Sequence, residues 1–330
     1  MSQSAAEIPE HNLQRKAAIA RGGVFDHAGS VTVTPITDFD LGRTIFDTLE
    51  GALPRFVIRT RVAKQMKWQS NTRSEVERAY QSSSVDGPPP EVSEDLRRFL
   101  VDECDFDVEH ADGSFLDHLY FCYEYSFRHY PERSPLVMLL HSILGTGTNT
   151  FAMDASKIPA LQALMNAFEW AHVEAFPSVL RLLYAMELRA ELWANKTRLD
   201  QLRAVRFHRV IDDKPLEMNA DEFWIQLNYQ LIHLVDFLPV SNWTAHANDT
   251  AFIVFRDLYA FLEETARLEA VIDYTPAQAG RGIEGESQTL GAKLVDLLPV
   301  KLSERMAAKS VKRFSGRINH CIDYELLWGA

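Results

Sequence analysis

The sequence predicts a mainly α-helical protein, and three observations support this. From about residue 93 onward, long stretches repeat apolar residues at helical spacing. Helix-start signals precede some of these stretches, such as Ser93 before an apolar run and Pro135 in a first helical turn. Strand-like alternation of β-branched residues is short and rare by comparison.

The first part of the chain, residues 1–92, is predicted to be a small irregular α+β extension. The segment SVTVTPITDF alternates β-branched residues and predicts a short strand. The segment 69–95 is rich in serine and contains three consecutive prolines, so we expect an exposed and mobile excursion there.

The second part, residues 93–270, is predicted to be a helical domain, and residues 271–330 a loop and a C-terminal helix that docks on it. A turn at Asp212–Asp213 between two β-rich pieces predicts a hairpin. The helix after it is expected to begin at Asn219 and to stop before Pro239. The helices expected from the sequence are 93–104, 113–130, 134–144, 158–175, 176–204, 219–239, 249–271 and one further helix after residue 291.

Composition and charge narrow the class of protein. The formal net charge is −12, from 46 acidic and 34 basic residues, which argues against binding to nucleic acid or to a membrane. The basic stretch Lys309–Arg317 is interpreted as a solvated helix end rather than a phosphate site. Three scattered cysteines suggest no disulfide framework, and no apolar stretch is long enough to cross a bilayer. We therefore expect a cytoplasmic protein with a small-molecule substrate, and the oligomeric state stays open.

Four residues could carry metal chemistry. His118 and His141 lie 23 residues apart on successive predicted helices, and His233 and Asp236 share one face of a later helix. Imidazoles and a carboxylate that converge from different helices are how metal sites in helical bundles are built. A histidine on an apolar helix is, on the other hand, more often a core residue than a ligand.

The loop that follows His141 has two interpretations. Gly145 could cap the preceding helix, with threonine and asparagine side chains closing a turn, and this interpretation is favoured. In the second interpretation the loop lines a pocket, where Thr146 would orient the substrate. The loop lacks the lysine of a phosphate-binding P-loop.

The order of these residues resembles the HD-domain superfamily. The resemblance is carried by His118 in one helix, LLHSILGT at the end of the next, and a distal aspartate; it spans about residues 93–268. It is most similar to a branch in which H-S-I-x-G-T replaces the H-D pair. The resemblance implies a helical bundle with His118, His141 and Asp236 as metal ligands, and His233 as an additional ligand or general base. Ser142 replaces the aspartate that would bridge two metals, so a single divalent metal is expected.

The expected function is therefore a metal-dependent enzyme that acts on a small polar molecule. Two histidines and one carboxylate with open positions favour a mononuclear iron(II) oxygenase, and a metal-dependent hydrolase is an alternative. A metal-free scaffold of the same fold, which binds a ligand or a partner, is an alternative from a different class, supported by Ser142. A metal-free enzyme with His141 as general base, aided by Thr146 or Ser142, is a further alternative.

Overall fold

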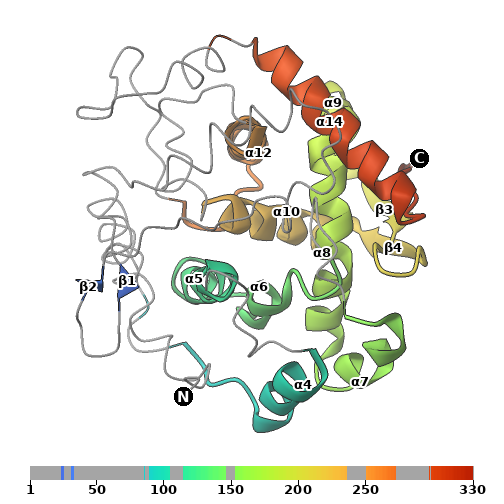
Figure 1. Ribbon diagram of the computed structural model, residues 1–330. Helices are drawn as coiled ribbons and strands as arrows, with labels where there is room; N and C mark the ends of the chain where they lie inside the picture. The colour runs from blue at the N-terminus through green and yellow to red at the C-terminus, as the bar shows by residue number, and fades with distance from the viewer. Residues whose placement is uncertain are drawn as a thin grey trace.

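The computed structural model describes residues 24–25, 31–32, 85, 89–104, 114–145, 153–235, 250–272, 297 and 299–329 of the chain (Figure 1). In chain order its elements are β1 (Val24–Phe25), β2 (Val31–Thr32), α4 (Glu94–Cys104), α5 (Ser114–His129), α6 (Leu136–Leu140), η4 (Ala155–Lys157), α7 (Ile158–Gln162), α8 (Ala167–Ala185), α9 (Glu187–Ala194), η5 (Lys196–Gln201), β3 (Leu202–His208), β4 (Pro215–Asn219), α10 (Ala220–Val235), α12 (Thr250–Glu264), α14 (Val300–Arg317) and β5 (Glu325–Trp328).

The described part of the chain is mainly helical, as the sequence predicts. The longest described helix, α8, contacts α6, α9, α10, α12 and α14, and α10 contacts α5, α8 and α12. Figure 1 shows α10 crossing beside α8, with α5 and α6 on one side of α10 and α12 on the other. The core therefore lies around α8 and α10. The HD-like arrangement of these helices stays a prediction.

A small antiparallel sheet, with strand order β4-β3-β5, packs against α10. The predicted hairpin is present, because β3 and β4 pair directly and Asp213 between them has a φ of 57°. The central strand β3 pairs Val205 with Met218 on one side and with Leu326 on the other. The last strand thus brings the C-terminal part of the chain into the sheet.

Ionic contacts join the C-terminal helix to the body. α14 packs against α8 and α12. The buried guanidinium of Arg189 on α9 lies 2.6 Å from a carboxylate oxygen of Asp257 on α12 and 2.9 Å from one of Glu304 on α14. The positive charge of the buried arginine is therefore compensated, and its two ion pairs join α9 to α12 and α14.

The helix boundaries around Pro177 differ from the prediction. The sequence suggests one helix that ends at residue 175 and another that begins at 176, but α8 runs continuously through Pro177. The chain breaks instead at Met186, whose φ of 78° separates α8 from α9. A proline inside a helix costs about 3 kcal/mol. Burial on both sides of the position, at Val173, Phe176 and Leu180, offsets that cost.

Two segments predicted from the sequence are not tested by the structure. Most of residues 1–92 and the predicted loop at 274–291 lie outside the described residues. Within the described residues, every helix is too short or too polar to cross a lipid bilayer.

Candidate metal centre

Three potential metal ligands converge from three different helices. Cys122 lies on α5, His141 directly follows α6, and His233 lies near the end of α10. The ligand atoms, one sulfur and two imidazole nitrogens, all lie within 4.8 Å of one another. Their exposed fractions are 0%, 1% and 8%, so the cluster is buried in the helical core.

The turn after α6 explains why His141 stands at a helix end. The helix ends at Leu140, and the amide of Gly145 donates to the carbonyl of Ser142 at 3.1 Å. Gly145 has a φ of +129°, which L side chains rarely adopt, and a Cβ there would lie 2.8 Å from Cγ1 of Val210. Glycine is therefore required at this position, and the chain leaves the helix while the imidazole of His141 stays in the core.

The orientation of the His141 ring is fixed by a backbone hydrogen bond. Its Nδ1 lies 2.7 Å from the carbonyl oxygen of Met138. Because a carbonyl only accepts, Nδ1 carries the proton and Nε2 keeps its lone pair. Nε2 lies 3.1 Å from Nδ1 of His233, which donates to it when no ion is bound. A carbonyl that holds one ring nitrogen and fixes the tautomer is a usual outer support of a metal-ligating histidine.

Burial keeps both imidazoles neutral near pH 7. Removal from water lowers the pKa of His141 to about 4, and the hydrogen bond to Met138 opposes that shift only in part. The pKa of His233 lies well below its usual value, first because of burial and second because of the neighbouring His141. Neutral imidazole is the form that binds metal ions.

α8 supplies an aromatic wall beside the two histidines. The ring centroid of Phe176 lies 4.8 Å from that of His141 and 5.5 Å from that of His233. The side-chain amide of Gln230, one turn before His233 on α10, donates to the carbonyl oxygen of Phe176 at 3.0 Å. This bond holds α10 against α8, so both the wall and the ligand keep their places.

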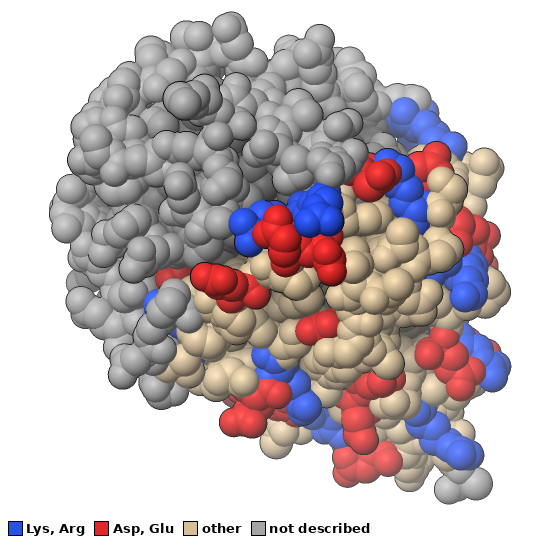
Figure 2. Space-filling view, turned by 90° about the horizontal axis from the view of Figure 1, so that it is seen from below, with Lys and Arg blue, Asp and Glu red and all other residues tan. Residues whose placement is uncertain are grey.

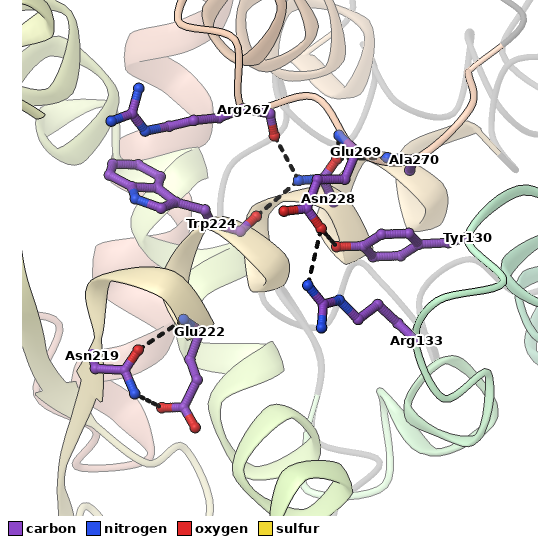
Figure 3. A network of polar contacts seen from close by, with 9 residues as sticks. All are labelled: Tyr130, Arg133, Asn219, Glu222, Trp224, Asn228, Arg267, Glu269 and Ala270. Carbon is purple, nitrogen blue, oxygen red and sulfur yellow. Dashed lines mark hydrogen bonds and ion pairs between the residues drawn. The ribbon is translucent and has the colours of Figure 1, made fainter. Parts of the chain in front are cut away.

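A second network fixes α10 further along (Figure 3). The side-chain nitrogen of Asn228 donates to the carbonyl oxygens of Trp224 and Arg267, both at 2.9 Å. Its oxygen accepts from the amides of Glu269 and Ala270 at 2.8 and 3.0 Å. All hydrogen-bonding groups of this buried amide are therefore used. They tie α10 to the segment that follows α12.

The same segment is tied to the end of α5. The hydroxyl of Tyr130 donates to Oε2 of Glu269 at 2.6 Å, and Nη2 of Arg133 lies 3.4 Å from the same oxygen (Figure 3). The elements that carry Cys122 and His233 are thus linked through Glu269, whose carboxylate contacts Tyr130 and whose backbone amide donates to Asn228.

The donor geometry fits one metal ion. Two nitrogen ligands at about 2.0–2.1 Å from a tetrahedral ion lie roughly 3.3 Å apart. The two imidazole nitrogens of His141 and His233 lie 3.1 Å apart. A sulfur ligand and a nitrogen ligand of such an ion lie roughly 3.6 Å apart, and the sulfur of Cys122 lies within 4.8 Å of both nitrogens.

The predicted site residues have different outcomes. His141 and His233, predicted as a ligand and as an additional ligand or general base, lie side by side. His118 lies on α5, but its side chain is outside the described residues, as are Asp236 and Thr146. Their roles stay predictions. Ser142 is buried directly after His141.

Cys122 is the member of the cluster that the sequence analysis missed. It was counted among three scattered cysteines, because no other cysteine lies near it in the sequence. The available signal was its spacing of four residues from His118 within an aromatic helical stripe, which predicts a shared helix face.

Comparisons with known proteins do not assign the site. No protein-family model matches the chain, and no curated protein or solved structure is significantly similar to it. Function is therefore inferred from the described residues themselves.

Proposed function

We propose that this protein is a mononuclear metalloenzyme that acts on a small polar molecule, with Cys122, His141 and His233 as its metal ligands. The observation that carries the proposal is the convergence of these three ligand atoms, from three helices, within 4.8 Å in the core. The carbonyl of Met138 supports it further, because it presents Nε2 of His141 to the cluster.

The donor set favours zinc over iron. Thiolate with imidazole suits Zn²⁺, whereas the iron(II) oxygenases expected from the sequence use two histidines and a carboxylate. Three protein ligands are also the number typical of catalytic zinc sites; structural zinc sites are usually closed by four. A bound ion of this kind supplies Lewis-acid chemistry through its open coordination position. We therefore place hydrolysis of a small polar substrate first.

An iron oxygenase is the second candidate, and one observation favours it. The surroundings of the cluster are dry and aromatic, with Phe176 only 1% exposed. Such surroundings exclude water from a reactive centre. In either reaction the role of Phe176 is to exclude water, and that of Met138 is to orient the His141 ring.

Metal content tests the proposal directly. Protein purified without a histidine tag is analysed for zinc, iron and manganese, and compared with the variants Cys122→Ser, His141→Gln and His233→Gln. Matched controls are Cys321→Ser, a cysteine elsewhere in the fold, and His172→Gln, a buried imidazole that bonds Gln226 instead of the cluster. We expect near-stoichiometric metal in the native protein and in both controls, and its loss in the three ligand variants.

Two results would contradict the metal centre. One is the absence of bound metal after reconstitution with zinc, and with iron(II) under anaerobic conditions. The other is retention of metal in all three ligand variants. The contact between His141 and His233 would then be a hydrogen bond of the core, and the metal-free scaffold would be the better description.

The reaction class is tested on the loaded protein. Zinc-loaded protein is assayed against a panel of small phosphate and carboxylate esters, and iron-loaded protein for consumption of oxygen. Turnover that needs zinc and is lost in Cys122→Ser supports hydrolysis. Oxygen consumption that needs iron and is lost in the same variant supports the second candidate.

A further inference from the structure

A groove with basic walls lies away from the metal cluster, between the start of α9 and the face of α14. Its volume is about 910 Å³, and it shares no lining residue with the cluster. Small side chains, Ala185, Ala190 and Ala308, contribute the apolar part of its lining. A volume of this size accommodates a small organic molecule, since ligand sites span about 300–1,000 Å³.

The cations of the groove come from one face of α14. Arg305, Lys309, Lys312 and Arg313 all line it, at spacings of four, three and one residues that a helix brings to one side. Each of these four residues is exposed. Glu187 is the single carboxylate among the described lining residues, and it is already bonded to Lys312. Two of the four cations, Arg305 and Lys309, have no carboxylate partner within the described ranges.

This concentration of cations is unusual for the protein as a whole. The chain has a formal net charge of −12. On the face seen in Figure 2, lysine and arginine side chains are interspersed with aspartate and glutamate. In the groove, four cations face one carboxylate. Like charges brought together repel one another, and an anionic ligand removes that repulsion.

We propose that this groove is a binding site for a small organic molecule that carries two or more phosphate groups. Arginine and lysine together recognise phosphate by forked hydrogen bonds and by charge. Because several cations are spread along α14, a ligand with several phosphate groups fits them better than a ligand with a single phosphate. The stretch Lys309–Arg317, interpreted from sequence as a solvated helix end, thus contributes three lining residues of the site, Lys309, Lys312 and Arg313.

The test is calorimetric titration of the full-length protein with ATP and with inorganic pyrophosphate, at constant ionic strength. The variants are Lys309→Glu and Arg305→Glu, with Lys309→Gln as a milder change should charge reversal disturb folding. The matched control is Lys301→Glu, the same charge reversal on an exposed residue of α14 that does not line the groove. Circular dichroism checks that each variant is folded.

We expect saturable binding that is at least about tenfold weaker in each groove variant, equal to about 1.4 kcal/mol. Binding in Lys301→Glu should stay close to that of the native protein. The Cys122→Ser variant should also bind normally, because the groove and the metal cluster are separate sites. The two proposals can therefore be tested independently, because loss of the metal site would leave the groove intact and loss of the groove would leave the metal site intact.

Three results would overturn the polyphosphate site. The first is no saturable binding of either probe at physiological ionic strength. The second is equal weakening in Lys301→Glu, which would indicate attraction by overall charge. The third is binding that is lost in Cys122→Ser and kept in the groove variants.

Parallel titrations with vesicles of anionic phospholipid and with a polyglutamate peptide identify other partners. Binding of one of these without binding of the soluble polyphosphates would also overturn the proposal.

Discussion

Nε2 of His141 and Nδ1 of His233 face each other at 3.1 Å, and the pair can share either a proton or an ion. Nδ1 of His141 is committed to the carbonyl oxygen of Met138, so its Nε2 can only accept. In the metal-free pair, His233 therefore carries its proton on Nδ1. Metal binding requires that proton to move to the other nitrogen of the same ring, a tautomer change that alters no net charge.

Cobalt substitution should reveal the thiolate in this cluster. Cobalt(II) bound to a cysteine sulfur gives a sulfur-to-metal charge-transfer absorption, and we expect this band in the native protein. Cys122→Ser should abolish the band and weaken binding by more than the roughly 10–100-fold that loss of an outer hydrogen-bond partner costs. The measurement is absorption during titration with cobalt(II). Cys321→Ser should keep the band; a band that persists in Cys122→Ser would place the sulfur ligand elsewhere.

Gly145→Ala should destabilise the protein and disturb His141. A φ of +129° is strained for alanine, and the added Cβ would lie 2.8 Å from Cγ1 of Val210. Strain of this kind costs about 1–3 kcal/mol, and the overlap adds to it. Chemical denaturation gives the free energy of unfolding, and metal titration gives the effect on the site.

The matched control for that substitution is Gly316→Ala. Gly316 lies inside α14, and a Cβ there meets nothing within 4 Å. Alanine is favoured over glycine in a helix by about 1 kcal/mol, so this variant should be neutral or more stable. Equal losses of stability in both variants would show that the turn at Gly145 is not specially constrained.

Local signals in the sequence located several elements but not all of their bounds, since the expected helices 158–175 and 176–204 are divided differently among α7, α8, α9, η5 and β3. Asn219 caps α10 as predicted, because an asparagine cap needs contacts only within its own turn. Here its side-chain oxygen accepts a hydrogen bond from the backbone amide of Glu222 at 2.9 Å. The hairpin at Asp212–Asp213 is equally local. The passage of α8 through Pro177 was not predictable from the same signals, because burial against distant elements decides it.

The candidate site shows the same division between local and distant information. His141 could be identified from the sequence, because it is a polar residue at the end of an apolar helix. That His233 meets it, 92 residues further along the chain, depends on the packing of both α6 and α10 against α8 and α5. For Cys122 the only local signal was its spacing of four residues from His118, since a buried cysteine behaves as a small apolar residue unless ligands surround it.

Asn228→Ala should be far more damaging than loss of a surface cap. The substitution leaves the carbonyl of Arg267 and the amides of Glu269 and Ala270 without their partner. A buried group left unsatisfied costs about 1–3 kcal/mol. Two of these three hydrogen bonds are only part-buried, so we expect a total loss towards the lower end, about 3–5 kcal/mol. Asn219→Ala, which removes an exposed cap on the same helix (Figure 3), should cost only about 1 kcal/mol. Similar losses in denaturation experiments would contradict the central role of Asn228.

Acid should destabilise the fold through His172. Burial lowers the pKa of this imidazole from 6.5 to about 4; Arg133 lowers it further, and the hydrogen bond to Gln226 opposes the shift. In the unfolded chain the imidazole binds a proton near pH 6.5, whereas the folded protein leaves it neutral until about pH 4. The contribution of His172 is therefore complete above about pH 6.5 and lost as the pH falls towards 4. A displacement of this size corresponds to about 3 kcal/mol.

The measurement for His172 is the free energy of unfolding by urea at a series of pH values from 7 to 4. In His172→Gln the decline over this window should be smaller by about 3 kcal/mol, because glutamine does not titrate. Part of the decline should remain, since burial also lowers the pKa of His320 to about 4. Lys214→Gln, on the exposed hairpin, should follow the native profile. If His172→Gln followed the native profile as well, His172 would have to gain its proton at the same pH in the folded and unfolded chains, and its buried environment would not control its titration.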